Sequence, residues 1–130
     1  MEEKRTDLLA LLLRPELPNV QKELPTAEYR VKRLSEALGT DVVFKLRALP
    51  YGKVKSIRDS VAGDPGLEIL LAGCVEPDLK AKELKEKYGG ATPAETVKAM
   101  LLPGEIEDLS RAGERLCGFR RITIDEVKNA

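Results

Sequence analysis

Residues 69–106 read ILLAGCVEPDLKAKELKEKYGGATPAETVKAMLLPGEI, a stretch of short apolar segments separated by clear helix boundaries. Residues 67–75 are apolar almost throughout, which predicts a buried element. We favour a helix there, although periodicity alone does not exclude a strand. Thr92 stands at an N-cap position, with Pro93 at the first helical position and Glu95 three residues after the cap. The stretch therefore predicts short helices packed around an aliphatic core.

Helical patterns continue on both sides of this stretch. Apolar residues recur at three- and four-residue spacing after Pro50, and again in the segment that ends at Gly118. Between them, Gly89 and Gly90 stop a further helix with the sequence AKELKEKY. At the end of the chain we predict one or two more helical turns beginning at Thr123.

Between residues 28 and 49 the apolar period changes to two. Phe44 and Leu46 alternate with polar positions, which predicts a half-buried strand, and the residues around Tyr29 show a weaker alternation of the same kind. The turn chemistry around Gly39 joins the two segments into an antiparallel pair. Because two strands alone are barely stable, helices are expected to pack on one face of the pair.

These patterns predict an α+β fold that is predominantly helical. Its parts are a small antiparallel β-hairpin over residues 28–49, followed by a bundle of about five helices over residues 50–130. Together they form a single globular domain, residues 26–130. An arm rich in Leu and Pro, residues 1–25, precedes this domain.

The arm combines a run of leucines with three prolines. Thr6 or Asp7 caps a short helix that contains the run LLALLL, and the prolines that follow favour an extended path. The leucines cover every side of such a helix, so it exposes more apolar surface than it hides. Either the arm folds back onto its own domain, or it docks on a neighbouring subunit or partner. The candidate partner-binding residues are Leu8, Leu9, Leu12, Leu13 and Leu17.

The charge balance argues against two large classes of partner. Twenty-two Lys and Arg residues balance 22 Asp and Glu residues, so no net field attracts nucleic acid or an acidic membrane. The longest apolar run is far shorter than the roughly 20 residues of a membrane span. The first residues lack the pattern of a secretory signal. We expect a soluble cytoplasmic protein.

The carboxylates and glycines of the chain do not form a recognisable catalytic motif. Glu105, Glu107 and Asp108 invite attention as general bases, but they fall in the first turn of a helix, where the dipole stabilises negative charge. Gly89 and Gly90 lack the surrounding residues of a phosphate-binding loop. We therefore expect a protein that works by contact, without catalytic residues and without a cofactor.

Cys74 and Cys117 are the two cysteines of the chain. Both have apolar neighbours, and free cysteine is among the residue types most often buried. We expect two buried thiols in a reducing compartment. The sequence has no histidine and no CxxC pair, which argues against a zinc site.

The segment LAGCVEPDLKAKELKEKYGGATPAETVKAMLLPGEIEDL, residues 71–109, resembles the XkdN-like tail assembly chaperones of contractile-tailed phages and PBSX-type prophages. VKRLSEALGTDVVFKLRAL, residues 31–49, and the arm resemble that family too. The resemblance implies a small protein of the bacterial host cytoplasm that binds the tape-measure protein and keeps that long apolar chain soluble. It also implies that the protein assists polymerisation of the tail tube and is absent from the mature virion. The tail-tube protein is a second candidate partner, and the arm is a candidate contact in a homo-oligomer.

Functions of other classes stay open from the residues alone. A small helical regulator that binds nucleic acid requires a basic recognition helix, and the nearest candidate, residues 80–87, mixes Lys with Glu. Another protein-interaction adaptor, or a carrier of a small molecule, would require a binding pocket that sequence does not reveal.

Overall fold

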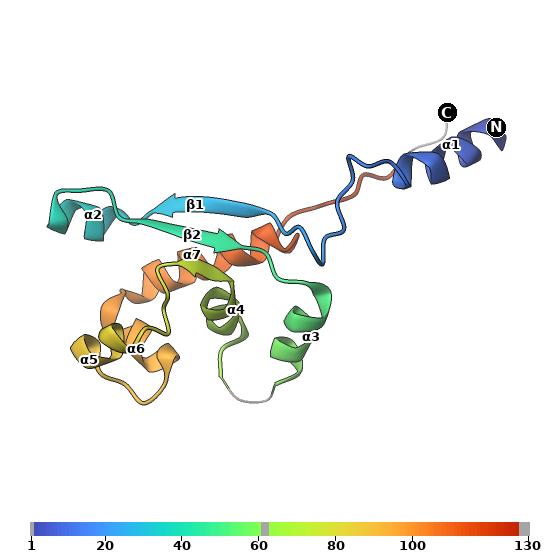
Figure 1. The fold of residues 1–130 in the computed structure, drawn as a ribbon. Coiled ribbons are helices and arrows are strands. Elements are labelled where there is room, and N and C mark those ends of the chain that lie inside the picture. Colours follow the sequence, from blue (N-terminus) through green and yellow to red (C-terminus); the bar gives the residue numbers. More distant parts are fainter. Residues whose placement is uncertain (1, 61–62, 128–130) are drawn as a thin grey trace.

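The computed structural model describes residues 2–60 and 63–127. A three-stranded sheet lies over a layer of helices, with α4 and α7 directly beneath it and α3, α5 and α6 around them (Figure 1). The elements in chain order are α1 (Glu2–Leu12), β1 (Thr26–Arg30), α2 (Lys32–Leu38), β2 (Val43–Arg47), α3 (Tyr51–Asp59), α4 (Pro65–Gly73), β3 (Cys74–Glu76), α5 (Lys82–Tyr88), α6 (Pro93–Met100) and α7 (Pro103–Leu116). The predominantly helical α+β class and the five helices after the second strand are confirmed.

The strands pair antiparallel in the order β1-β2-β3, with Tyr29 opposite Phe44 and Leu46 opposite Cys74. Phe44 and Leu46 are buried against the helices, so the period-two pattern of β2 is confirmed. The predicted hairpin is incomplete, because β3 adds a third strand. That strand comes from the end of the apolar run, where the alternative between helix and strand was left open.

Gly73 explains why this apolar run is divided between α4 and β3. A Cβ atom on Gly73 would lie 2.7 Å from the Arg47 carbonyl oxygen, so the last turn of α4 touches the backbone of β2. A side chain at this position would keep the two backbones apart. The chain therefore leaves α4 already beside β2 and continues as β3.

The connection between the first two strands is helix α2, where the sequence predicted a turn. Ser35, which is buried, holds this helix in place. Its Oγ donates to the Val31 carbonyl oxygen at 2.8 Å and accepts from the Val42 backbone N–H at 2.8 Å. Gly39 ends the helix with a φ of 69°, as a left-handed C-cap. One short polar side chain thus connects the residue before α2 with the residue that precedes β2.

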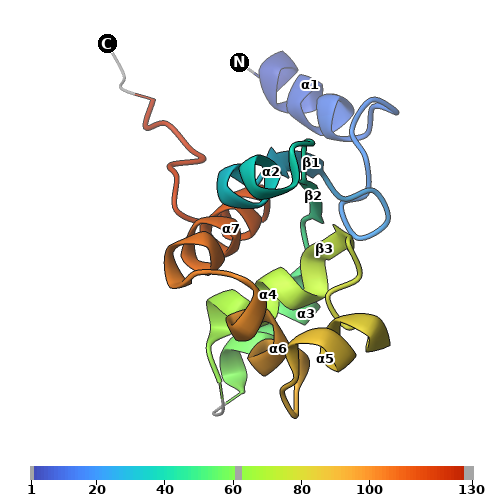
Figure 2. The same ribbon diagram turned by 90° about the vertical axis from the view of Figure 1, so that its left-hand side faces the viewer.

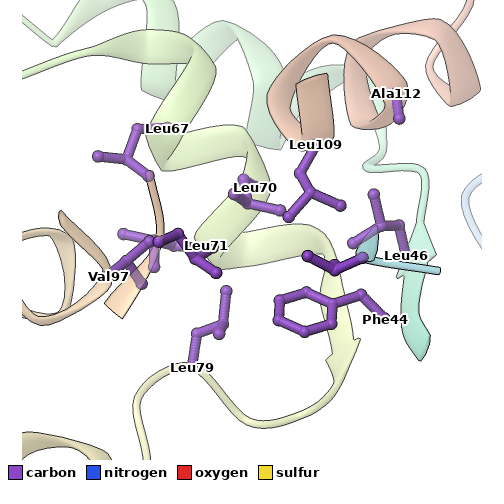
Figure 3. Packing of buried hydrophobic residues seen from close by; sticks show 11 residues of the cluster. Phe44, Leu46, Leu67, Leu70, Leu71, Leu79, Val97, Leu109 and Ala112 are labelled. Carbon is purple, nitrogen blue, oxygen red and sulfur yellow. The ribbon is translucent and has the colours of Figure 1, made fainter. Parts of the chain in front are cut away.

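The core lies between the sheet and the helices. Figure 3 shows Phe44 and Leu46 of the sheet meeting Leu70 of α4 and Leu109 of α7, with Leu79 and Val97 completing one side. The buried hydrophobic side chains of this cluster are aliphatic except for Phe44. This core holds the sheet and the helices α4 to α7 together as one packed unit, which we call the body. The arm precedes it in sequence.

The predicted start of α6 and the predicted end of α7 are confirmed. Thr92 caps α6 by accepting from the Glu95 N–H at 3.3 Å, while the Glu95 carboxylate accepts from the Ala91 N–H at 2.9 Å. Gly118 follows α7 with a φ of 92°. The turns predicted from Thr123 are not present: residues 122–127, the last described, contain no helix.

Candidate functional site

The arm carries the predicted partner-binding residues, and the structure leaves their side chains in solvent. Helix α1 stands apart from the sheet and from the other helices in both views (Figures 1 and 2). It begins at Glu2, so Thr6 lies inside the helix and not at its cap. All five predicted leucines are exposed, from 52% for Leu17 to 75% for Leu13. Leu11 and Val20, which the sequence analysis did not select, are exposed with them.

The connection between α1 and the body consists of hydrogen-bonded turns. The Leu17 N–H donates to the Arg14 carbonyl oxygen at 3.1 Å. Asn19 then anchors a second turn, in which its carbonyl oxygen accepts from the Lys22 N–H at 2.8 Å and its Oδ1 accepts from the Gln21 N–H at 2.9 Å. These hydrogen bonds, together with the restricted backbone of Pro15 and Pro18, direct the arm away from the rest of the protein.

An apolar groove of about 520 Å³ opens where the arm meets the body. Three stretches that are distant in sequence form its walls: the base of the arm, residues 48–59 with helix α3, and the end of α7 with the residues that follow it. Its apolar lining consists of Val20, Leu24, Pro25, Ala48, Leu49, Pro50, Tyr51, Val54, Leu116 and Phe119. Tyr51 stands at the rim and is 78% exposed.

The polar groups around this groove already have partners. The Arg58 guanidinium lies over the Phe119 ring, 4.0 Å from its centroid. Lys55 pairs with Asp59 one turn along α3, at 3.2 Å between Nζ and Oδ2. The surface that remains for a partner is therefore aliphatic and aromatic. Such a surface favours binding of an apolar helix over catalysis.

The two cysteines differ from the prediction, because both are only half-buried. Burial still raises the pKa of the Cys74 thiol to about 11, and its Sγ donates to the Pro77 carbonyl oxygen at 3.2 Å. The Cys117 sulfur accepts from the Leu49 N–H at 3.3 Å, beside the groove. A thiol with a raised pKa is a poor nucleophile at neutral pH, so Cys74 has the properties of a packing residue.

The carboxylates at the start of α7 are engaged in structural contacts. Glu105 forms a two-pronged ion pair with Arg33 and accepts from the Leu102 N–H at 2.7 Å. Arg33 holds the pKa of Glu105 below its ordinary value. Glu107 pairs with Arg111 one turn along the helix. These roles agree with the interpretation of both residues as parts of a helix start.

Two other kinds of site are absent from the residues that the structure describes. These residues contain no group of three or more His, Cys, Asp or Glu side chains placed to hold a metal ion. Within the same residues, no helix combines the length and the apolar character that crossing a bilayer requires.

Comparison with known proteins then places the chain. A family model described as phage XkdN-like tail assembly chaperone protein matches residues 66–130, half of the chain. One solved structure, described as the crystal structure of the protein YqbN, a structural genomics target, has a TM-score of 0.66 and 23% sequence identity. That match covers 83% of this chain and 94% of the other, and it shows a shared fold. No curated protein matches the chain.

Proposed function

We propose, because this chain belongs to the family of XkdN-like phage tail assembly chaperones, that it binds the tape-measure protein and assists assembly of the tail tube without catalysing a reaction. It acts in the cytoplasm of the bacterial host and is absent from the mature virion. The tail-tube protein is a second partner in this proposal, at the stage when tube and tape-measure protein meet.

One observation supports this proposal most directly: the leucines of the arm are exposed, and an apolar groove opens at the base of the same arm. Burial of a leucine contributes about 1.5–3 kcal/mol, so five leucines that are already partly covered contribute roughly 4–9 kcal/mol. Association itself costs about 4–15 kcal/mol. Because the two ranges are similar, the arm favours a reversible contact, which suits a chaperone that must release its client.

The ion pairs of two carboxylates and the raised pKa of one thiol support the part of the proposal that excludes catalysis. Glu105 and Glu107 are held in ion pairs, and the Cys74 pKa is raised to about 11. A general base or nucleophile normally has a pKa close to the working pH and an open path to the substrate. Because these side chains are poorly suited to catalysis, we propose that the protein acts by contact through its apolar surface.

Co-purification with the tape-measure protein tests the proposal. Full-length chain, a chain without residues 1–24, and the double variant Leu9→Glu/Leu12→Glu are each expressed with a tagged tape-measure protein. We expect the full chain to be retained, and retention to fall at least tenfold for both altered chains. Two buried carboxylates without partners are enough to remove a contact of this strength.

Leu38→Glu serves as the matched control, because Leu38 is 69% exposed on α2, outside the arm and the groove. Circular dichroism spectra of the substituted chains should coincide with that of the unaltered chain, since the changed side chains lie in solvent. The shortened chain should lose only the helical signal of α1. Retention of the tape-measure protein by the chain without its arm would remove the arm from the function. Failure of the full chain to retain it would contradict the proposed partner.

A further inference from the structure

The chain exposes far more surface than a compact protein of its size. It has 9906 Å² of solvent-accessible surface and a mass of 14.3 kDa, whereas a compact monomer of that mass exposes about 6,800 Å². The excess, roughly 3,100 Å², is larger than the 800 Å² or so that each partner contributes to a standard protein interface. Seven exposed large apolar side chains of the arm belong to this surface: Leu8, Leu9, Leu11, Leu12, Leu13, Leu17 and Val20.

The apolar groove at the base of the arm is the complementary feature. It is apolar along most of its lining, it is open to solvent, and its volume of about 520 Å³ matches several aliphatic side chains in scale. Helix α1 spans 11 residues, a length of about 16 Å. The leucines of α1 are exposed, and the groove offers an apolar surface long enough to contact part of such a helix.

The arm of the same chain is poorly placed to fill its own groove. Val20 and Leu24, at the base of the arm, already form one wall. To reach the groove, α1 would have to reverse direction within the turns anchored by Arg14 and Asn19. Pro15 restricts the backbone within the first of these turns, and Pro18 restricts it between them. Figures 1 and 2 show α1 directed away from the body.

We propose that the apolar groove of one copy receives helix α1 of a second copy, so that the protein associates with itself through exchange of its N-terminal arms. Reciprocal exchange gives each copy two contacts, one through its own arm and one through its groove. It is the smallest closed arrangement available to such a pair of surfaces. Each copy then covers the leucines of the other.

Light scattering on the purified chain, over a range of concentrations up to about 200 µM, tests this inference. We expect a mass above the 14.3 kDa of one chain, increasing with concentration towards twice that value. Two double variants should return the mass to that of one chain: Leu8→Glu/Leu12→Glu in the arm and Val20→Glu/Tyr51→Glu in the groove. All four side chains are at least 57% exposed, so the fold is retained.

The matched control is Leu38→Glu/Ile124→Glu, which adds the same two charges at exposed positions outside the arm and the groove. It should associate like the unaltered chain. A single-chain mass for the unaltered protein at every concentration would overturn the inference. So would a groove variant that associates as well as the control.

Mixing the two double variants distinguishes exchange from other forms of association. The groove variant keeps every leucine of the arm, and the arm variant has an intact groove, so an equimolar mixture should form mixed pairs through one remaining contact. A photo-crosslinker at position 12, used with isotope-labelled and unlabelled chains, should join the arm of one label to the groove of the other. Cross-links confined to chains of one label would assign the groove to the chain's own arm and overturn exchange.

These measurements are independent of the proposed function, because the tape-measure protein is absent from them. A chain that exchanges arms and ignores the tape-measure protein would contradict only the proposed function. A monomeric chain that binds the tape-measure protein through its arm would contradict only the exchange.

Discussion

Arg33 and Glu105, which are 72 residues apart in sequence, form a two-pronged ion pair that ties α2 to the start of α7. Arg33 Nε lies 3.0 Å from Glu105 Oε2, and Arg33 Nη2 lies 2.9 Å from Glu105 Oε1. The same Nη2 donates to the Met100 carbonyl oxygen at 3.2 Å, at the end of α6. A single guanidinium thus connects three helices, in the geometry that gives Arg–carboxylate pairs their specificity.

Replacement of Glu105 by Gln should lower the free energy of unfolding by about 1–2 kcal/mol at pH 7, because a charge-assisted pair and a helix cap are weakened together. The hydrogen bond from Arg33 lowers the pKa of Glu105 in the folded state. The unfolded chain therefore binds this proton more readily, and the contribution is present above pH 4.5 and lost as the pH falls below it. Urea unfolding at pH 7 and pH 3.5 measures both effects.

Glu107→Gln is the matched control for that change. Glu107 pairs with Arg111 within α7, and both side chains are about half exposed. Exposed pairs of this kind contribute less than about 1 kcal/mol. Equal effects of the two substitutions at pH 7 would mean that the contact between α2 and α7 adds no more to stability than an exposed pair within one helix.

Gly73 and Gly52 should respond in opposite directions to replacement by Ala. At Gly73 the new methyl group would meet the Arg47 carbonyl oxygen at 2.7 Å, so α4 and β2 would have to separate. We expect a loss of about 1–3 kcal/mol. Gly52 lies within α3 with no atom within 4 Å of the position of a Cβ, and Ala there should add about 0.5–1 kcal/mol. Thermal unfolding of the two variants tests this opposition.

The contrast between local and distant contacts also explains what the sequence could predict. Thr92, Pro93 and Glu95 mark the start of α6 by local hydrogen bonds and backbone preference, so the boundary was predictable. The alternation of Phe44 and Leu46 predicted β2 because burial on one face imposes a period of two. Helix α2 was missed because its short sequence has a weak pattern, and Ser35 stabilises it through contacts at both ends.

The candidate site divides in the same way. The leucine run of the arm is a local feature, and the sequence identified its excess of apolar surface. The apolar groove is not local, since its walls come from residues 20–25, 48–59 and 116–119. The contact of α3 with the residues that follow α7, through Arg58 and Phe119, brings Tyr51 and Phe119 to one groove. No sequence motif predicts a groove that is formed by residues so far apart in the chain.

Cys74 should resist alkylation in the folded protein. Burial raises its pKa to about 11, so little thiolate is present at pH 8. In a Cys117→Ser chain, where Cys74 alone reports, we expect iodoacetamide to react at least tenfold more slowly in buffer than in 8 M urea. Because the folded-state pKa is raised, the contribution of this thiol to stability should be complete below about pH 9 and be lost as the pH rises towards 11. Equal alkylation rates in buffer and in urea would contradict the burial of this thiol.

Replacement of Leu70 and of Leu12 by Ala should change the free energy of unfolding by different amounts, because Leu70 lies in the core and Leu12 in the exposed arm. Leu70 is 1% exposed at the centre of the core, in contact with both the sheet and α7 (Figure 3). Leu70→Ala should therefore lower the free energy of unfolding by about 2–5 kcal/mol, from lost burial and the cavity left behind. Leu12 is 61% exposed, and Leu12→Ala should change it by less than about 0.5 kcal/mol when one chain is studied at low concentration. Denaturant unfolding at about 1 µM measures both values. A loss above 2 kcal/mol for Leu12→Ala would mean that the arm packs on its own body, and its leucines would then be unavailable to any partner.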